Sequence, residues 1–168
     1  MHLERLFTSL LSAVGLIVCL WLWSLATTGA ADSLPLPRFV SLKSSEVNLR
    51  TGPGTRYPID WVYQRRGLPV EIIAEFDNWR RVRDSEGVVG WVHRALLSGR
   101  RGALVVPPDR IFRRAPEAGA RALFRAASGV LVEIISCDSV WCKVSHDDTK
   151  AWTKQGGLWG VYPGEVIK

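Results

Sequence analysis

The feature that most constrains this chain is an internal repeat with a period of roughly sixty residues, within the range that marks repeat architectures. The segment Gly67 to Ile73 (GLPVEII) recurs as Gly129 to Ile135 (GVLVEII), and each copy is followed by a tryptophan and a valine at matching positions. Self-similarity of this kind is typical of tandem modules in which each copy is one small structural unit. The sequence therefore predicts two copies of one small β unit.

Each copy is predicted to consist of short strands joined by turns. In the first copy, alternating or β-branched runs fall at residues 45–50, 59–63, 70–75, 79–83 and 88–92. Glycine, proline and other turn residues separate these runs. A single helical turn is expected at residues 93–97, followed by a last strand of the first copy at 103–106. The predicted fold class is all-β, with two tandem small barrels.

Residues 1–31 are predicted to be a signal peptide and not part of the fold. Residues 6–26 are almost entirely apolar, and the small residues around Ala30 and Ala31 suit signal peptidase cleavage. The apolar run is also long enough to span a bilayer, so an uncleaved inner-membrane anchor is the alternative. Both interpretations place the rest of the chain outside the cytoplasm, periplasmic or secreted, with membrane contact only through residues 6–26.

The charge distribution argues against nucleic acid as a partner. The chain has 22 Lys and Arg against 16 Asp and Glu, a net charge of +6. This surplus is spread over both copies, whereas nucleic-acid binding requires basic residues gathered on one face or along one helix. We therefore expect a mildly basic surface and no nucleic-acid site.

Cys137 and Cys142 are predicted to form a structural disulfide. They flank a four-residue hairpin turn, which places them opposite each other on neighbouring strands. Such a pair usually closes in an oxidising compartment. A redox pair would have two intervening residues, and a metal site has only His146 nearby as a third ligand, so neither is favoured. At the aligned positions of the first copy, Glu75 and Arg80 are expected to form a cross-strand ion pair.

The sequence contains no recognisable catalytic constellation. His93 follows a strand with no carboxylate at a suitable spacing, and His146 lies in a polar turn. Cys142 is expected in a disulfide, not at the helix start where a nucleophilic cysteine is activated. Paired carboxylates for glycoside cleavage stay open as an alternative, but small barrels without long loops offer poor clefts for such a reaction. The chain is predicted not to be an enzyme and to use no cofactor or metal.

Residues 47–58 (VNLRTGPGTRYP) and the tripeptide at 90–92 (GWV) resemble the signature segments of bacterial SH3-like domains. In the second copy, residues 110–116 lack the asparagine and both glycines of this signature. The chain resembles a tandem bacterial SH3-like (SH3b) protein of the α-proteobacterial envelope type, with domains at 39–106 and 109–168. The resemblance implies a non-catalytic module for which binding to cell wall or protein is expected.

The candidate ligand-binding residues lie in the first copy and are Tyr57, Trp61, Asn48, Arg50 and Arg56. The flat, amphipathic rings of Tyr57 and Trp61 suit sugars or proline-rich peptides, and arginines suit an anionic wall polymer. Asn48 also has a structural interpretation, because an asparagine before a turn often hydrogen-bonds its own backbone.

Four tryptophans recur at matching positions of the two copies and are predicted core residues: Trp79, Trp91, Trp141 and Trp152. The first copy is then expected to bind, with the second as a disulfide-stabilised partner. The predicted function is a periplasmic or envelope binding module that recognises peptidoglycan or its peptide stems. The alternative is a protein–protein adaptor that regulates an envelope enzyme in trans, so the expected partner is a cell-wall polymer or an envelope protein.

Overall fold

The computed structural model of the protein describes residues 34–168. The predicted signal peptide, residues 1–31, lies outside the described residues. Residues 35–168 form one compact unit. Within the described part of the chain, no helix is both long enough and apolar enough to span a membrane.

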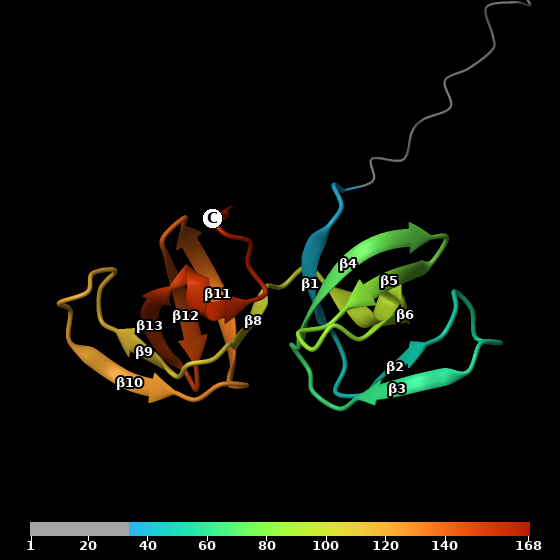
Figure 1. Ribbon diagram of the computed structural model, residues 1–168, viewed down its shortest axis with the longest axis horizontal. Helices are drawn as coiled ribbons and strands as arrows, with labels where there is room; N and C mark the ends of the chain where they lie inside the picture. The colour runs from blue at the N-terminus through green and yellow to red at the C-terminus, as the bar shows by residue number, and fades with distance from the viewer. Residues whose placement is uncertain (1–33) are drawn as a thin grey trace, which may run out of the picture. The chain divides into compact units, whose positions relative to one another are not determined.

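The described residues form two antiparallel sheets, each curled into a small barrel (Figure 1). The first sheet consists of β1 (Arg38–Leu42), β2 (Val47–Arg50), β3 (Ile59–Tyr63), β4 (Pro69–Phe76), β5 (Trp79–Arg83), β6 (Val89–His93) and β7 (Leu97–Ser98). The second consists of β8 (Gly102–Val105), β9 (Arg110–Arg113), β10 (Ala122–Ala126), β11 (Leu131–Asp138), β12 (Trp141–His146), β13 (Thr149–Lys154), β14 (Leu158–Trp159) and β15 (Val166–Ile167). Two single-turn 3-10 helices, η1 (Arg94–Leu96) and η2 (Gln155–Gly157), precede β7 and β14.

The two sheets have the same topology. Neighbouring strands run β3-β2-β6-β5-β4-β1-β7 in the first sheet and β10-β9-β13-β12-β11-β8-β14 in the second. The second sheet adds β15, which pairs with β11. The predicted fold class, two tandem small all-β barrels, is confirmed.

The strand predicted at residues 103–106 belongs to the other barrel. We expected it to close the first copy, but β8 pairs with β11 and β14 of the second sheet. It takes the place that β1 takes in the first sheet, and β1 was not predicted. Every residue of β8 is buried, so its sequence carries no alternation to show which sheet it joins.

The backbone conformation of Gly67 and Gly129 explains why the repeated segment begins with glycine in both copies. Both have left-handed backbone, with φ of 81° and 83°, a region that glycine adopts without steric cost. The amide of Gly67 donates to the carbonyl oxygen of Leu42 at 2.8 Å, and the amide of Gly129 donates to that of Val105 at 2.8 Å. The same turn therefore fastens the end of β1 in one barrel and of β8 in the other.

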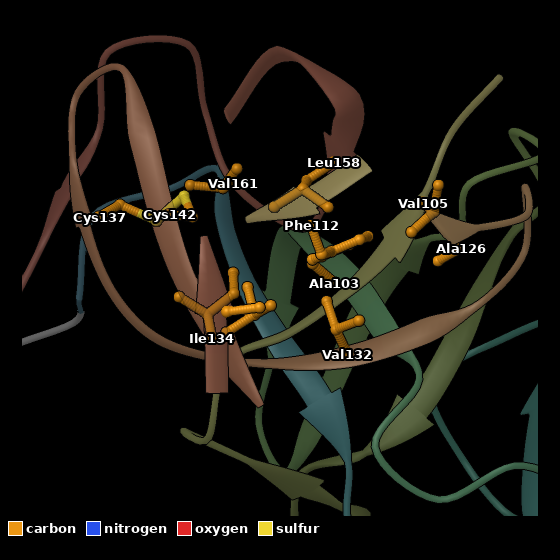
Figure 2. Close-up of a cluster of buried hydrophobic side chains, with 12 residues drawn as sticks. Ala103, Val105, Phe112, Ala126, Val132, Ile134, Cys137, Cys142, Leu158 and Val161 are labelled. Atoms are coloured by element: carbon orange, nitrogen blue, oxygen red, sulfur yellow. A yellow bond between two sulfur atoms is a disulfide. The ribbon is translucent and has the colours of Figure 1, made fainter. Parts of the chain in front are cut away.

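Each barrel has its own hydrophobic core. The first is formed by Leu42, Val47, Leu49, Tyr63, Val70, Ile72, Val82 and Val92. The second centres on Phe112, which is fully buried and stacks on Phe124 with ring centroids 4.7 Å apart. Figure 2 shows Phe112 among side chains from β8, β11, β12 and β14, together with both cysteines. Branched aliphatic residues supply most of the apolar surface that each small core removes from water.

The four recurring tryptophans lie outside both cores, so the prediction that they are core residues is wrong. All four are half-buried: Trp79, Trp91, Trp141 and Trp152. Strand alternation gives the reason, because successive side chains point to opposite faces. In β6, Gly90 and Val92 are buried and Trp91 between them faces outward.

The outer-face tryptophans are flanked by cationic side chains in both barrels. Trp91 lies opposite Arg50 and Arg81 on the neighbouring strands. Trp152 lies opposite Arg113 and Lys143, and the Lys143 Nζ is 5.9 Å from the Trp152 ring centroid. Long cationic side chains can cover an aromatic ring while keeping their charge in water. The recurrence of these tryptophans thus reflects packing on the outer face.

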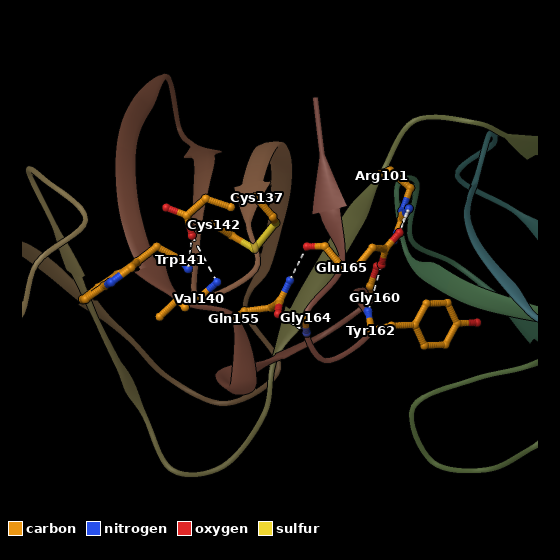
Figure 3. The surroundings of a disulfide bond; sticks show 11 residues. Arg101, Cys137, Val140, Trp141, Cys142, Gln155, Gly160, Tyr162, Gly164 and Glu165 are labelled. Atoms are coloured by element: carbon orange, nitrogen blue, oxygen red, sulfur yellow. Dashed lines mark hydrogen bonds and ion pairs between the residues drawn. A yellow bond between two sulfur atoms is a disulfide. The ribbon is translucent and has the colours of Figure 1, made fainter.

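Cys137 and Cys142 form the predicted disulfide, with Cα atoms 4.1 Å apart (Figure 3). They face each other as a cross-strand pair of β11 and β12. The turn between them is held by Asp138, whose carboxylate accepts the amides of Val140 and Trp141. These hydrogen bonds hold the pKa of Asp138 below its ordinary value. The expected ion pair of the first barrel is also present, because the Arg80 Nε lies 3.1 Å from the Glu75 carboxylate.

Aromatic and charged side chains connect the two barrels within the compact unit. The Phe39 ring lies 5.1 Å from that of Trp159 and 4.7 Å from that of Tyr162. The Tyr162 hydroxyl donates to Glu71 at 2.9 Å, and burial together with this bond raises the Tyr162 pKa. Glu71 is only 3% exposed and also accepts from Arg83 at 2.9 Å, so its charge is paired.

Arg101 fastens the C-terminal segment to the start of β8. Its guanidinium donates to both carboxylate oxygens of Glu165 and to the carbonyl oxygen of Gly160, as Figure 3 shows. Partial burial pushes the Glu165 pKa upward, but the bonds from Arg101 and the Tyr162 amide outweigh burial and hold it below its ordinary value. Bidentate pairs of this kind fix geometry as well as adding energy.

Replacing both cysteines by alanine should lower the free energy of unfolding by about 2 kcal/mol, because the crosslink restricts a short loop of the unfolded chain. The urea midpoint of full-length protein, followed by tryptophan fluorescence, measures this loss. Wild type treated with dithiothreitol is the matched control and should shift in the same direction. A midpoint that neither treatment lowers would contradict the prediction.

Candidate functional site

The loop between β2 and β3, residues 51–58, is held in place by two of the predicted ligand-binding residues. The Arg50 Nη1 donates to the carbonyl oxygens of Tyr57 at 2.7 Å and Thr55 at 3.1 Å. The Tyr57 ring covers Gly52 so closely that a Cβ there would overlap it. Arg56 lies over the Tyr57 ring, 5.1 Å from its centroid. Arg50 and Tyr57 therefore act as internal fasteners of the loop.

The second barrel uses the same fastener despite its different loop sequence. The Arg113 Nη1 donates to the carbonyl oxygen of Ala120 at 2.8 Å. Arg113 lies opposite Trp152 as Arg50 lies opposite Trp91, and each arginine reaches a carbonyl seven residues further along. Sequence reasoning missed this equivalence because the asparagine and glycines of the signature are absent around Arg113.

Asn48 lies within β2, opposite Val62 of β3, and is half-buried. In the part of the chain that the structure describes, no hydrogen bond of its side chain is found. The structural interpretation of Asn48, a bond to its own backbone, is therefore wrong. Its position gives it no place beside Trp61, which pairs with Leu49.

Of the predicted ligand-binding residues, Trp61 lines a groove on the surface of the protein. It lies on β3, which is at the edge of the first sheet, and its side chain is 59% exposed. The groove has a volume of about 510 Å³. One wall comes from the first barrel and includes Trp61, Leu68 and Val88; the other comes from the second and includes Leu104 to Pro107. We call this the Trp61 groove.

A hydrogen-bond cluster around Tyr63 and Asp84 lines part of the Trp61 groove. The Tyr63 hydroxyl donates to Asp84 at 2.9 Å, and Asp84 also accepts the amides of Glu86 and Val88. Burial and the bond to Asp84 raise the pKa of Tyr63 well above its ordinary value. Arg65 of the first barrel also lines the groove, and it donates to the carbonyl oxygen of Gly129 in the second barrel at 2.9 Å. The Tyr63 and Asp84 side chains thus satisfy each other, whereas the exposed Ser85 and Glu86 side chains have no partner within the described residues. Trp61, Leu68, Val88 and residues 104–107 supply apolar and aromatic surface for a ligand.

The structure therefore separates the predicted site residues. Trp61 lines the groove, whereas Tyr57, Arg50, Arg56 and Asn48 do not. The second wall was missed, because residues 104–107 appear in the sequence as a strand end and a proline-rich connection. A strand end beside proline carries no signal for what it faces in space.

Both histidines in the described region have structural contacts. The His93 Nδ1 accepts the amide of Ala95 at the start of η1. The His146 Nδ1 lies 3.1 Å from the carbonyl oxygen of Leu131, to which it must donate, since a carbonyl only accepts. Across residues 34–168, no three potential metal ligands gather at one point.

A family model described as the bacterial SH3 domain matches residues 43–99 and again residues 109–160. Because these two matches cover more than half of the chain, the protein belongs to the bacterial SH3 domain family, with two copies of the domain. The predicted resemblance to a tandem bacterial SH3-like protein is thereby confirmed.

The chain is also similar to YrvJ of Bacillus subtilis, which is named as a candidate N-acetylmuramoyl-L-alanine amidase. The two are 25% identical over 122 residues, which cover 66% of this chain and 23% of YrvJ. The chain thus spans about a quarter of that relative's length.

Among solved structures, the chain is similar to NlpC2 and NlpC1 from Trichomonas vaginalis, at 11% and 12% identity and a TM-score of 0.34 for each. These alignments cover 76% and 80% of this chain and 49% and 50% of those proteins. An NLPC/P60 family protein from Bacillus cereus aligns at 15% identity and a TM-score of 0.33, over 72% of this chain and 55% of that protein.

Tyr63→Phe should change how stability depends on pH. The folded protein keeps the Tyr63 proton, whereas the unfolded chain releases it above pH of about 10, so wild-type stability falls as pH rises past that value. At pH 7 the variant should be less stable by about 1 kcal/mol, because Asp84 loses a hydrogen bond. Urea unfolding from pH 7 to pH 11 should show this gap closing. A gap that stays constant would contradict the prediction.

Proposed function

We propose that this protein is a non-catalytic binding module of the cell envelope that recognises peptidoglycan or its peptide stems through the Trp61 groove. Trp61 supplies a flat ring on which a sugar or peptide can stack, and the second barrel supplies the facing apolar wall. The bacterial SH3 family membership and the similarity to YrvJ support this class of function.

The observation that carries the proposal is the exposure of Trp61 beside a preformed groove. Large aromatic residues are usually withdrawn from water, and an exposed one at the mouth of an apolar concavity is typical of a binding site. A groove of about 510 Å³ lies within the range of small-ligand sites. The name of YrvJ refers to N-acetylmuramoyl-L-alanine, a sugar joined to an amino acid, which has the mixed apolar and polar surface that such a groove suits.

Two further observations support the proposed location in the cell envelope and the proposal that the module is not catalytic. A disulfide between Cys137 and Cys142 is expected to persist outside the cytoplasm, in agreement with the apolar run at residues 6–26. The Nδ1 atoms of His93 and His146 are both engaged with the backbone. The module would thus bind the wall without cleaving it.

Co-sedimentation with purified peptidoglycan sacculi tests the proposal, with the full chain in mild non-ionic detergent. Wild type should pellet at low and moderate salt. Trp61→Ala should weaken pelleting about tenfold, the effect of losing a central aromatic contact worth about 1.4 kcal/mol. Phe76→Ala is the matched control, because Phe76 is 60% exposed but lies outside the groove.

Two outcomes would overturn the proposal. If wild type stays in the supernatant at both salt concentrations, the adaptor function takes its place. The free edge of β3, with Ile59, Trp61 and Val62 exposed, then offers a surface for a partner's strand. If Trp61→Ala and Phe76→Ala pellet like wild type, the wall contact does not lie in the groove.

A further inference from the structure

A second cleft, separate from the Trp61 groove, lies within the compact unit and is also lined by both barrels. It has a volume of about 500 Å³ and shares no lining residue with the Trp61 groove. Its charged lining residues are Lys43, Arg66, Arg100 and Arg101 from the chain before β8, and Glu133, His146 and Asp147 from the second barrel. We call it the charged cleft.

The charges of this cleft are sorted by wall. Every charged lining residue that precedes β8 is cationic, and both carboxylates belong to the second barrel. A cleft lined by one sign of charge selects ions of the other sign. A cleft with one cationic and one anionic wall instead selects a ligand whose own charges are separated.

Three of the four cations are free to meet a ligand. Arg101 is already occupied by Glu165 and Gly160. Lys43, Arg66 and Arg100 are exposed, and their side chains have no partner within residues 34–168. Because these three cations have no partner in the protein, they can bind a carboxylate group of a ligand.

The opposite wall is carried by two exposed carboxylates. Glu133 lies on β11, and Asp147 lies in the turn between β12 and β13 with φ of 44°. His146, anchored to Leu131, has its Nε2 3.5 Å from the Asp147 carboxylate. The Glu133 side chain has no partner within the described residues, so it can accept hydrogen bonds from an ammonium group.

The floor of the charged cleft is closely packed and fixed. The Gly102 amide donates to the Ser41 hydroxyl at 2.8 Å, and Ser41 is almost fully buried. A Cβ at Gly102 would overlap the carbonyl oxygen of Gly67, so only glycine allows this approach of the two barrels. The charged walls therefore stand on a floor with a defined geometry, which lowers the entropy that binding must overcome.

From this arrangement we propose that the charged cleft binds a small zwitterion, namely a free amino acid or a short peptide. Its carboxylate would lie against Lys43, Arg66 and Arg100, and its ammonium group against Glu133 and Asp147. A simple anion meets repulsion from the two carboxylates, and a simple cation meets repulsion from the three free cations. Binding here would occur beside, and independently of, the proposed wall contact at Trp61.

Three ligands of equal length test the charge requirement. Trialanine is a zwitterion, N-acetyl-trialanine is an anion and trialaninamide is a cation. In NMR titrations of the ¹⁵N-labelled full chain, trialanine should shift the amides of Gly67 and Gly102 and leave the Trp61 indole unchanged. Its affinity should exceed that of either blocked peptide by about tenfold or more, because each blocked form leaves one wall unpaired.

Charge-neutral variants assign the two walls. Arg66→Gln/Arg100→Gln should weaken trialanine about tenfold and remove any residual binding of N-acetyl-trialanine. Glu133→Gln/Asp147→Asn should weaken trialanine by a similar factor and abolish its advantage over the acetylated peptide. Asparagine tolerates the left-handed backbone of Asp147, so this variant should keep the turn. Glu117→Gln/Arg121→Gln, which neutralises one exposed charge of each sign outside the cleft, should bind like wild type.

The proposal fails if trialanine causes no shift at Gly67 or Gly102 at concentrations up to about 10 mM, where even weak affinity becomes measurable. It also fails if N-acetyl-trialanine binds as tightly as trialanine, since the cleft would then be a simple anion site. Sacculus pelleting lost through Trp61→Ala, with unchanged trialanine binding, would separate this result from that of the proposed wall contact.

Discussion

Strand alternation within barrels of limited size determines where each kind of side chain can go. The strands of both sheets are between two and eight residues long, so each contributes only a few inward positions. Branched aliphatic residues, Tyr63 and Phe112 take most of these positions, and the four recurring tryptophans are left on the outer faces. With their interiors filled, the barrels can only form ligand sites on their surfaces or where they meet. Both clefts described above lie where residues of the two barrels come together.

Much of the architecture could be predicted from local patterns. The GLPVEII repeat, the alternation of residues 59–63 and the spacing of Cys137 and Cys142 each depend on neighbours along the chain, and each prediction was confirmed. The cross-strand pair of Glu75 and Arg80 followed from the same register. Local patterns succeed here because a hairpin joins residues that are close in sequence.

The errors concern pairings and contacts between residues far apart in sequence. β8 joins β11 and β14 instead of the first sheet, and a fully buried strand has no alternation that would indicate this. A shared register showed that Trp91 and Trp152 are equivalent, but not which face they occupy. Trp61 was predicted as a ligand-binding residue, yet its facing wall of residues 104–107 depends on how the second barrel packs against the first. Such information lies in tertiary contacts.

The C-terminal segment illustrates how far a functional unit can extend past its recognisable domains. The second family match ends at residue 160, yet Tyr162 bonds to Glu71 of the first barrel, Glu165 binds Arg101 at the start of β8, and β15 pairs with the disulfide-bearing strand. A chain cut at the end of the match would retain most of the second core while losing its ties to Arg101 and Glu71. Domain recombination that copied only the matched segments would therefore leave behind β1 and β8, one strand of each barrel, as well as the bond from Tyr162 that joins the barrels.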